Sequence, residues 1–211
     1  MRTIIDYSVY LVSDRSMASG TVEEIIREAV KGGVGIVQLR EKTASTREFL
    51  HYAIRIRDCL AEFNIPLIIN DRLDIALAVN AAGVHVGQDD MPCSQVRKIV
   101  GPTKIVGVSV STPEEAVAAE EESADYLGIS PIYTTPTKKD TPPAVGLGGL
   151  KIIRTVTTLP LIGIGGLHAG NASDVIKAGA NGIAVVSAIM TSSDPCRTAR
   201  DLRDAVERGR T

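Results

Sequence analysis

The chain has 211 residues, of which 44% are apolar and 23% are charged, and its formal net charge is −2. This composition is typical of one globular domain with a sizeable core, and it gives no reason to expect a nucleic-acid or membrane partner. Because the sequence shows neither a secretory signal nor an apolar run of roughly 18 residues, we expect a cytoplasmic protein without a membrane span.

Cysteine usage indicates a reducing compartment. Cys59, Cys93 and Cys196 are odd in number, lie far apart and form no CxxC pair. We therefore expect neither a disulfide framework nor a zinc site.

Short β-branched segments alternate along the chain with amphipathic segments of helical period. In chain order, the expected strands are 8–12, 35–39, 66–69, 83–86, 105–110, 126–129, 161–163 and 182–187. The expected helices are 21–31, 45 or 46 to 63, 73–80, 94–100, 113–123, 149–155, 171–178 and 195–207. Thr21 and Thr112 have the sequence context of helix caps.

Strand, helix and strand at this spacing predict parallel pairing through right-handed crossovers. Eight such units predict an α/β fold, a single-domain (β/α)₈ TIM barrel over residues 1–211. A doubly wound open sheet is the alternative. In a TIM barrel the functional residues lie where strands end and the following loops begin.

The residues after the second expected strand suit an anion. Strand alternation puts Gln38, Arg40 and Lys42 on one side, where an amide and two cations match an oxyanion or a diphosphate. A solvated charged loop is the competing interpretation.

The residues after the third and fourth expected strands suit a metal ion. Asp71 and Asp90 come from neighbouring strand ends and are candidates to share one Mg²⁺. Helix capping competes for Asn70, Asp71 and Asp89. His85 lies among apolar residues, and such a histidine is more often packed or hydrogen-bonded than catalytic.

Two further regions suit phosphate groups. Residues 130–143 form the longest irregular segment and combine hydroxyls with two lysines, as binding loops do. After the seventh and eighth expected strands, the glycine-rich 163–166 and the small-residue 186–188 predict a phosphate cradle of backbone N–H groups. Ser109, after the fifth strand, is a candidate hydrogen-bonding residue.

Seven motifs follow these strands in a fixed order. They are QLREK at 38–42, ND at 70–71, HVGQDD at 85–90, GVS at 107–109, a threonine segment ending in KKD at 138–140, GIGG at 163–166 and VVSAI at 185–189. In that order, from Tyr10 to about Pro195, the chain resembles the thiamine phosphate synthase family. Ser130-Pro131, where the family often has Gly-Pro, and Pro136 between two threonines are departures in loop detail.

The resemblance implies a transferase that joins hydroxymethylpyrimidine diphosphate to a thiazole phosphate or thiazole carboxylate phosphate and releases pyrophosphate, with Mg²⁺ as cofactor. The implied contacts of the pyrimidine diphosphate are Gln38, Leu39, Arg40, Glu41, Lys42, Asn70, Ser109 and Lys138, of which Arg40, Lys42 and Lys138 are catalytic. The implied metal ligands are Asp71 and Asp90. The implied contacts of the thiazole phosphate are Thr135, Pro136, Thr137, Gly166, Val186 and Ser187.

Three other functions are compatible with parts of this pattern. A thiazole tautomerase on the same barrel would keep the monophosphate site and lose the diphosphate and metal residues. A non-catalytic phosphate-binding barrel would have no reason to gather acids and cations at the other strand ends. A phosphosugar epimerase would need an acid/base pair, and the carboxylates of the HVGQDD motif could be mistaken for one. The expected partners are phosphorylated small molecules, and a homo-oligomer is compatible with the sequence.

Overall fold

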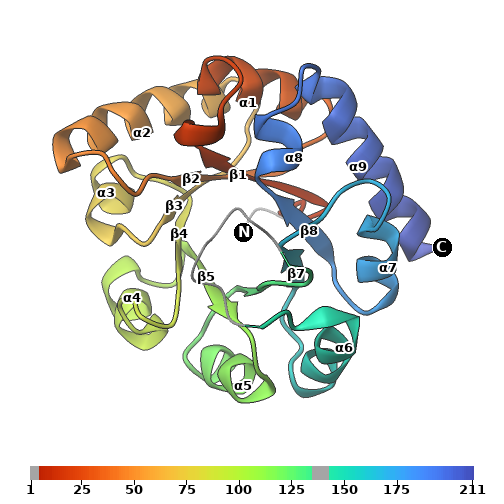
Figure 1. The fold of residues 1–211 in the computed structure, drawn as a ribbon. Coiled ribbons are helices and arrows are strands. Elements are labelled where there is room, and N and C mark those ends of the chain that lie inside the picture. The colour runs from red at the N-terminus through yellow and green to blue at the C-terminus, as the bar shows by residue number, and fades with distance from the viewer. Residues whose placement is uncertain (1–4, 135–142) are drawn as a thin grey trace.

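The computed structural model describes residues 5–134 and 143–211, which form a closed barrel of parallel strands inside a ring of helices (Figure 1). The strands are β1 (Val9–Asp14), β2 (Ile36–Arg40), β3 (Leu67–Asn70), β4 (Gly83–Val86), β5 (Ile105–Val110), β6 (Tyr126–Ile129), β7 (Leu161–Ile164) and β8 (Gly182–Val185). Each strand pairs with the next, and β8 pairs with β1. The predicted TIM barrel is therefore confirmed, and the open sheet is excluded.

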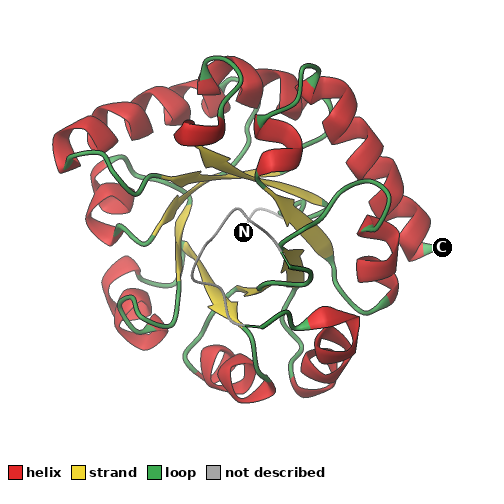
Figure 2. Ribbon diagram, in the orientation of Figure 1, coloured by secondary structure: helices red, strands yellow, loops and turns green. Residues whose placement is uncertain are grey.

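Helices cover the outside of the barrel, as Figure 2 shows in red. They are α1 (Val22–Lys31), α2 (Thr46–Ala61), α3 (Leu73–Ala78), α4 (Cys93–Val100), α5 (Pro113–Glu121), α6 (Gly146–Val156), α7 (Ala172–Lys177), α8 (Ser187–Met190) and α9 (Pro195–Arg210), with a 3₁₀ turn η1 (Arg15–Met17) after β1. The predicted caps Thr21 and Thr112 accept hydrogen bonds from the first turns of α1 and α5. Within the described ranges, none of these helices has the length and apolar character needed to cross a membrane.

Several predicted boundaries differ from the observed ones where chain segments approach the barrel mouth. The strand expected over 182–187 ends at Val185, and Ser187 begins the helix α8. A helix of 4 residues is too short to show the helical period, so its apolar sequence resembles a strand. Helix α6 begins at Gly146 rather than at 149. The start was predicted too late because the run GLGG is more typical of a loop than of a first helical turn.

Strand side chains alternate between two apolar cores. Outward side chains such as Leu11, Val37 and Ile69 pack under the helices. Inward side chains form a smaller core inside the barrel, made of Tyr10, Val12, Ile36, Ile68, Tyr126, Ile162 and Ala184. Because the strands are buried on both faces, their sequences are nearly continuous apolar runs.

Basic side chains stabilise the N-terminal end of the barrel by binding backbone carbonyls. Arg97 on α4 donates to the carbonyls of Gly101, Lys104 and Ser123, and it pairs with Asp125 at 2.5 Å. Other arginines that donate to carbonyls at this end are Arg154, Arg203 and Arg210. These cations are therefore committed to the fold.

Replacing Arg97 by alanine should lower the free energy of unfolding by roughly 2–4 kcal/mol, because Asp125 and three carbonyls would lose a partly buried donor. Urea denaturation of the purified variant measures this loss. Lys98→Ala removes an exposed cation from the same helix and should change stability by less than about 0.5 kcal/mol. Equal stabilities of the two variants would contradict the assignment.

Candidate active site at the barrel mouth

A cavity of about 870 Å³ opens at the C-terminal ends of the strands. Its volume is in the range of small-molecule sites. Most of the predicted site residues line it, namely Gln38, Arg40, Lys42, Asn70, Asp71, Asp90, Ser109, Gly166, Val186 and Ser187. Four predicted residues lie outside the described part of the chain, namely Thr135, Pro136, Thr137 and Lys138. The fold thus gathers residues from six strand ends into one cavity.

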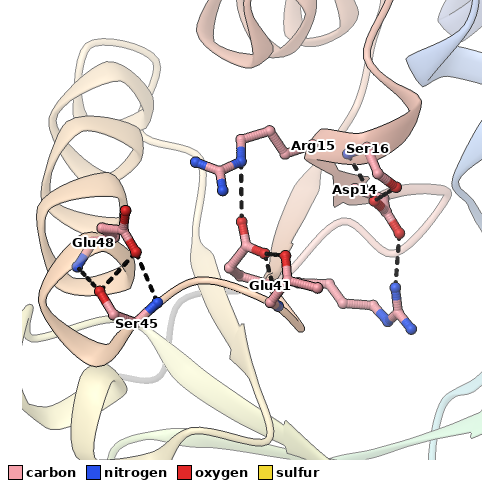
Figure 3. Close-up of polar contacts among 8 residues, drawn as sticks. Asp14, Arg15, Ser16, Glu41, Ser45 and Glu48 are labelled. Carbon is pink, nitrogen blue, oxygen red and sulfur yellow. Dashed lines mark hydrogen bonds and ion pairs between the residues drawn. The ribbon is translucent and has the colours of Figure 1, made fainter.

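The side chains of Leu39 and Glu41 do not line this cavity. Leu39 is fully buried in the outer core under the helices, because it alternates with the inward-facing Gln38 and Arg40. The Glu41 carboxylate lies 3.3 Å from the guanidinium of Arg15, which Figure 3 shows beside η1. The sequence-based expectation that Leu39 and Glu41 contact the substrate is therefore not supported for their side chains.

Arg40 is held at the mouth by an acid that the sequence did not single out. Its guanidinium lies 2.8 Å from the carboxylate of Asp14, and both side chains are largely buried. Asp14 also accepts hydrogen bonds from the backbone N–H and hydroxyl of Ser16, as Figure 3 shows. Asp14 was missed because the first strand was expected to end at Val12, two residues early.

Two carboxylates meet beside Lys42. Lys42 Nζ lies 2.5 Å from Asp71 Oδ2, and Asp90 Oδ2 accepts the backbone N–H of Gly87 at 2.7 Å. Burial raises the pKa of Asp90, and the adjacent Asp71 carboxyl adds to this effect. A carboxyl group whose charge is disfavoured by burial beside a second acid is a natural partner for a cation.

The alternative interpretation, in which Asn70, Asp71 and Asp89 cap helices, is wrong. The N-cap residue of α3 is Arg72 and that of α4 is Pro92, and neither helix has a side-chain cap. Asn70, Asp71 and Asp89 are therefore not used as caps. Asp71 also has a φ of 62°, a left-handed conformation that is uncommon outside glycine and is often found at functional sites.

His85 is hydrogen-bonded at both ring nitrogens. Nδ1 lies 2.9 Å from the hydroxyl of Tyr126, and Nε2 lies 2.8 Å from the hydroxyl of Ser109. Burial lowers the pKa of His85 to about 4, so the imidazole is neutral at pH 7. The sequence-based preference for a hydrogen-bonded histidine is thus confirmed, while its partner Tyr126 was not anticipated.

The loops after β7 and β8 form the opposite wall of the cavity. Gly166 has a φ of 65°, and a Cβ there would lie 2.9 Å from the Cβ of Tyr133. The side-chain amide of Asn171 donates to the carbonyl of Gly166 and helps to fix this turn. Across from it, Val186 and Ser187 lead into α8, where the first backbone N–H groups lack a carbonyl one turn earlier.

The comparisons with known proteins agree with this geometry. The family model described as thiamine monophosphate synthase matches residues 9–189. The chain is 50% identical over 200 residues to a thiamine-phosphate synthase of Albidiferax ferrireducens, covering 94% of this chain and 91% of that protein. It is also 50% identical to a thiamine-phosphate synthase of Syntrophomonas wolfei, covering 96% and 98% of the two chains.

A solved structure supports the same relationship. The thiamine phosphate pyrophosphorylase from Pyrococcus furiosus superposes with a TM-score of 0.88 at 37% identity, over 97% of each chain. The match therefore extends across nearly the whole barrel. The chain therefore belongs to the thiamine monophosphate synthase family and is an enzyme of thiamine biosynthesis.

Proposed function

We propose that this enzyme condenses 4-amino-2-methyl-5-hydroxymethylpyrimidine diphosphate with a thiazole phosphate, giving thiamine phosphate and pyrophosphate. The observation that carries this proposal is a single cavity with two different walls. One wall has cations and acids from β2, β3 and β4, and the other has glycine turns and backbone N–H groups after β7 and β8. Two phosphorylated substrates would face each other across it.

The β2 wall suits the diphosphate. Arg40 provides a planar fork for phosphate oxygens, and Lys42 provides a compact charge beside it. Both are paired with acids, Asp14 and Asp71, which hold them at the mouth of the cavity. Lys138 from the long loop stays a predicted third cation, since it lies outside the described residues.

Asp71 and Asp90 fit Mg²⁺. Mg²⁺ typically takes one or two carboxylates and completes its shell with water and substrate phosphate oxygens. The described residues hold no group of three or more histidine, cysteine or acidic side chains, so an all-protein cage is not available there. When bound, Mg²⁺ would neutralise diphosphate charge and make pyrophosphate a better leaving group.

The β7 and β8 wall suits the thiazole phosphate. The glycine turn at Gly166 lines the cavity, and the N–H groups near Ser187 are suitable donors. Thr135, Pro136 and Thr137 are predicted to complete this site from the loop.

The chain's contribution to the reaction is to bind, orient and neutralise charge. Arg40 and Lys42 would stabilise the charge on the departing pyrophosphate. Loss of pyrophosphate leaves a pyrimidine cation stabilised by the ring amino group, and the thiazole nitrogen attacks that carbon. No protein nucleophile is required, so holding the two substrates face to face would supply much of the rate.

The thiazole tautomerase alternative is disfavoured by the residues of the β2 to β4 wall. Arg40, Lys42, Asp71 and Asp90 line the cavity together, and a tautomerase has no diphosphate for them to bind. Location in the cytoplasm and assembly into a homo-oligomer stay predictions from the sequence. Pyrophosphate release should require both substrates and Mg²⁺, and a purified protein that makes no thiamine phosphate under these conditions would refute the proposal.

Changing Arg40 to glutamine should raise the KM for the pyrimidine diphosphate roughly 10- to 100-fold, because a charged hydrogen bond to phosphate is lost. The KM for the thiazole phosphate should stay the same. Steady-state kinetics with each substrate varied separately tests this. Arg15→Gln is the matched control, because Arg15 pairs with Glu41 outside the cavity.

Removing the metal ion and replacing its ligand Asp90 should lower the activity to a similar extent. Asp90→Asn, or chelation of the wild-type enzyme by EDTA, should lower kcat/KM by roughly 100-fold or more, because charge on the leaving group would no longer be neutralised. Added Mg²⁺ should restore the chelated wild type but not the variant. An Asp58→Asn control removes an exposed acid on α2. A fully active Asp90→Asn variant would remove this residue from the metal site.

Gly166→Ala should affect the other substrate. A Cβ at this left-handed position would displace the turn away from Tyr133, so the KM for the thiazole phosphate should rise about tenfold. The pyrimidine diphosphate KM should stay near the wild-type value. Gly148→Ala adds a methyl group where nothing lies within 4 Å and serves as the control. Equal changes in both KM values would argue against two separate walls.

A further inference from the structure

A chain of hydrogen bonds crosses the inside of the barrel along the cavity. The Gln38 amide nitrogen lies 3.0 Å from the hydroxyl of Tyr10, which lies 2.8 Å from the hydroxyl of Tyr126. Tyr126 then contacts His85, and His85 contacts Ser109, at 2.9 and 2.8 Å. All five residues of this relay line the cavity, and Gln38 and Ser109 are its two ends. The reaction proposed above gives no role to the two tyrosines between them.

A glycine on the intervening strand leaves space for this relay. Strand β5 lies between the strands of His85 and Tyr126, and Gly107 is the residue paired with both of them. A Cβ at Gly107 would lie 2.1 Å from the Tyr126 ring, so only glycine leaves room for the phenol to reach across β5. Tyr10 and Tyr126 are almost completely buried, so their hydroxyls have little access to water.

Counting protons gives the relay a direction. Each tyrosine has one hydroxyl proton, and a neutral imidazole has one N–H. If Gln38 donates to Tyr10, then Tyr10 donates to Tyr126, and Tyr126 donates to His85 Nδ1. His85 must then carry its proton on Nε2 and donate it to Ser109. If Tyr126 donated to Tyr10 instead, the buried Tyr10 proton would have no acceptor in the relay, at a cost in free energy.

We propose that Tyr10 and Tyr126 are positioning residues that fix His85 as the Nε2–H tautomer and so make Ser109 a hydrogen-bond donor toward the cavity. The same direction leaves the Gln38 carbonyl oxygen as an acceptor at the other end. The cavity then presents one acceptor and one donor. An aminopyrimidine carries the complementary pair, an amino group that donates and a ring nitrogen that accepts. The identity of this ligand rests on the proposed function, whereas the tautomer does not.

The tautomer is measured without any substrate. Protein labelled with ¹⁵N in its histidines should show the ring nitrogens of His85 as the neutral Nε2–H form at pH 7, with the His85→Gln variant identifying its signals among the 3 histidines. In Tyr126→Phe, which removes the donor to Nδ1, the Nδ1 signal should move toward that of an unbonded nitrogen. An Nδ1–H tautomer in the wild type would overturn the proposal, whether or not the enzyme makes thiamine phosphate.

Kinetics test the consequence for substrate selection. Tyr126→Phe and Tyr10→Phe should each raise the KM for the pyrimidine diphosphate about tenfold, with the thiazole phosphate KM unchanged. Tyr52→Phe is the matched control, because Tyr52 is a buried tyrosine on α2 whose hydroxyl has no hydrogen-bond partner among the described residues. Wild-type KM values in both relay variants, or equal rises for both substrates, would overturn the positioning role.

Discussion

Closure of the sheet is the constraint on which the rest of this molecule depends. Because β8 pairs with β1, every strand has two hydrogen-bonded neighbours and the sheet has no edge. All eight strands run parallel, so all their C-terminal ends meet in one ring. Residues as distant in sequence as Gln38 and Ser187 thereby line the same cavity.

The two ends of the barrel use charge differently. At the N-terminal end, Arg97 and similar cations donate to backbone carbonyls and are satisfied within the fold. At the C-terminal end, Arg40 and Lys42 pair with the acids Asp14 and Asp71, and phosphate oxygens can share or replace such partners. This division explains how a chain with a net charge of −2 can present a local anion site.

The inside of the barrel combines packing and polarity. Its apolar core includes the rings of Tyr10 and Tyr126, whose hydroxyl groups are linked to the imidazole of His85 and the amide of Gln38. Such a buried network is stable only when each donor has an acceptor. The same requirement that stabilises the interior therefore determines which groups reach the cavity, so binding specificity and folding share their hydrogen bonds.

The sequence by itself determined the barrel, its order of elements and most of the cavity wall. Local periodicity indicates strands and helices, and parallel topology requires strand ends such as Arg40, Asp71 and Gly166 to meet. It could not reveal Asp14, because the end of a strand is weakly marked, nor the short helix at Ser187. It also could not separate Leu39 and Glu41 from their inward-facing neighbours within one motif.

Only the tertiary structure decided the long-range pairings. Tyr10 and Tyr126 are separated by 116 positions, and each alone is an ordinary buried aromatic residue in a strand. Their hydroxyls meet because the strand register brings Tyr126 level with Gly107 and leaves space across β5. Local sequence patterns specify the elements, whereas the closure and register of the barrel specify which polar atoms lie within hydrogen-bond distance of one another.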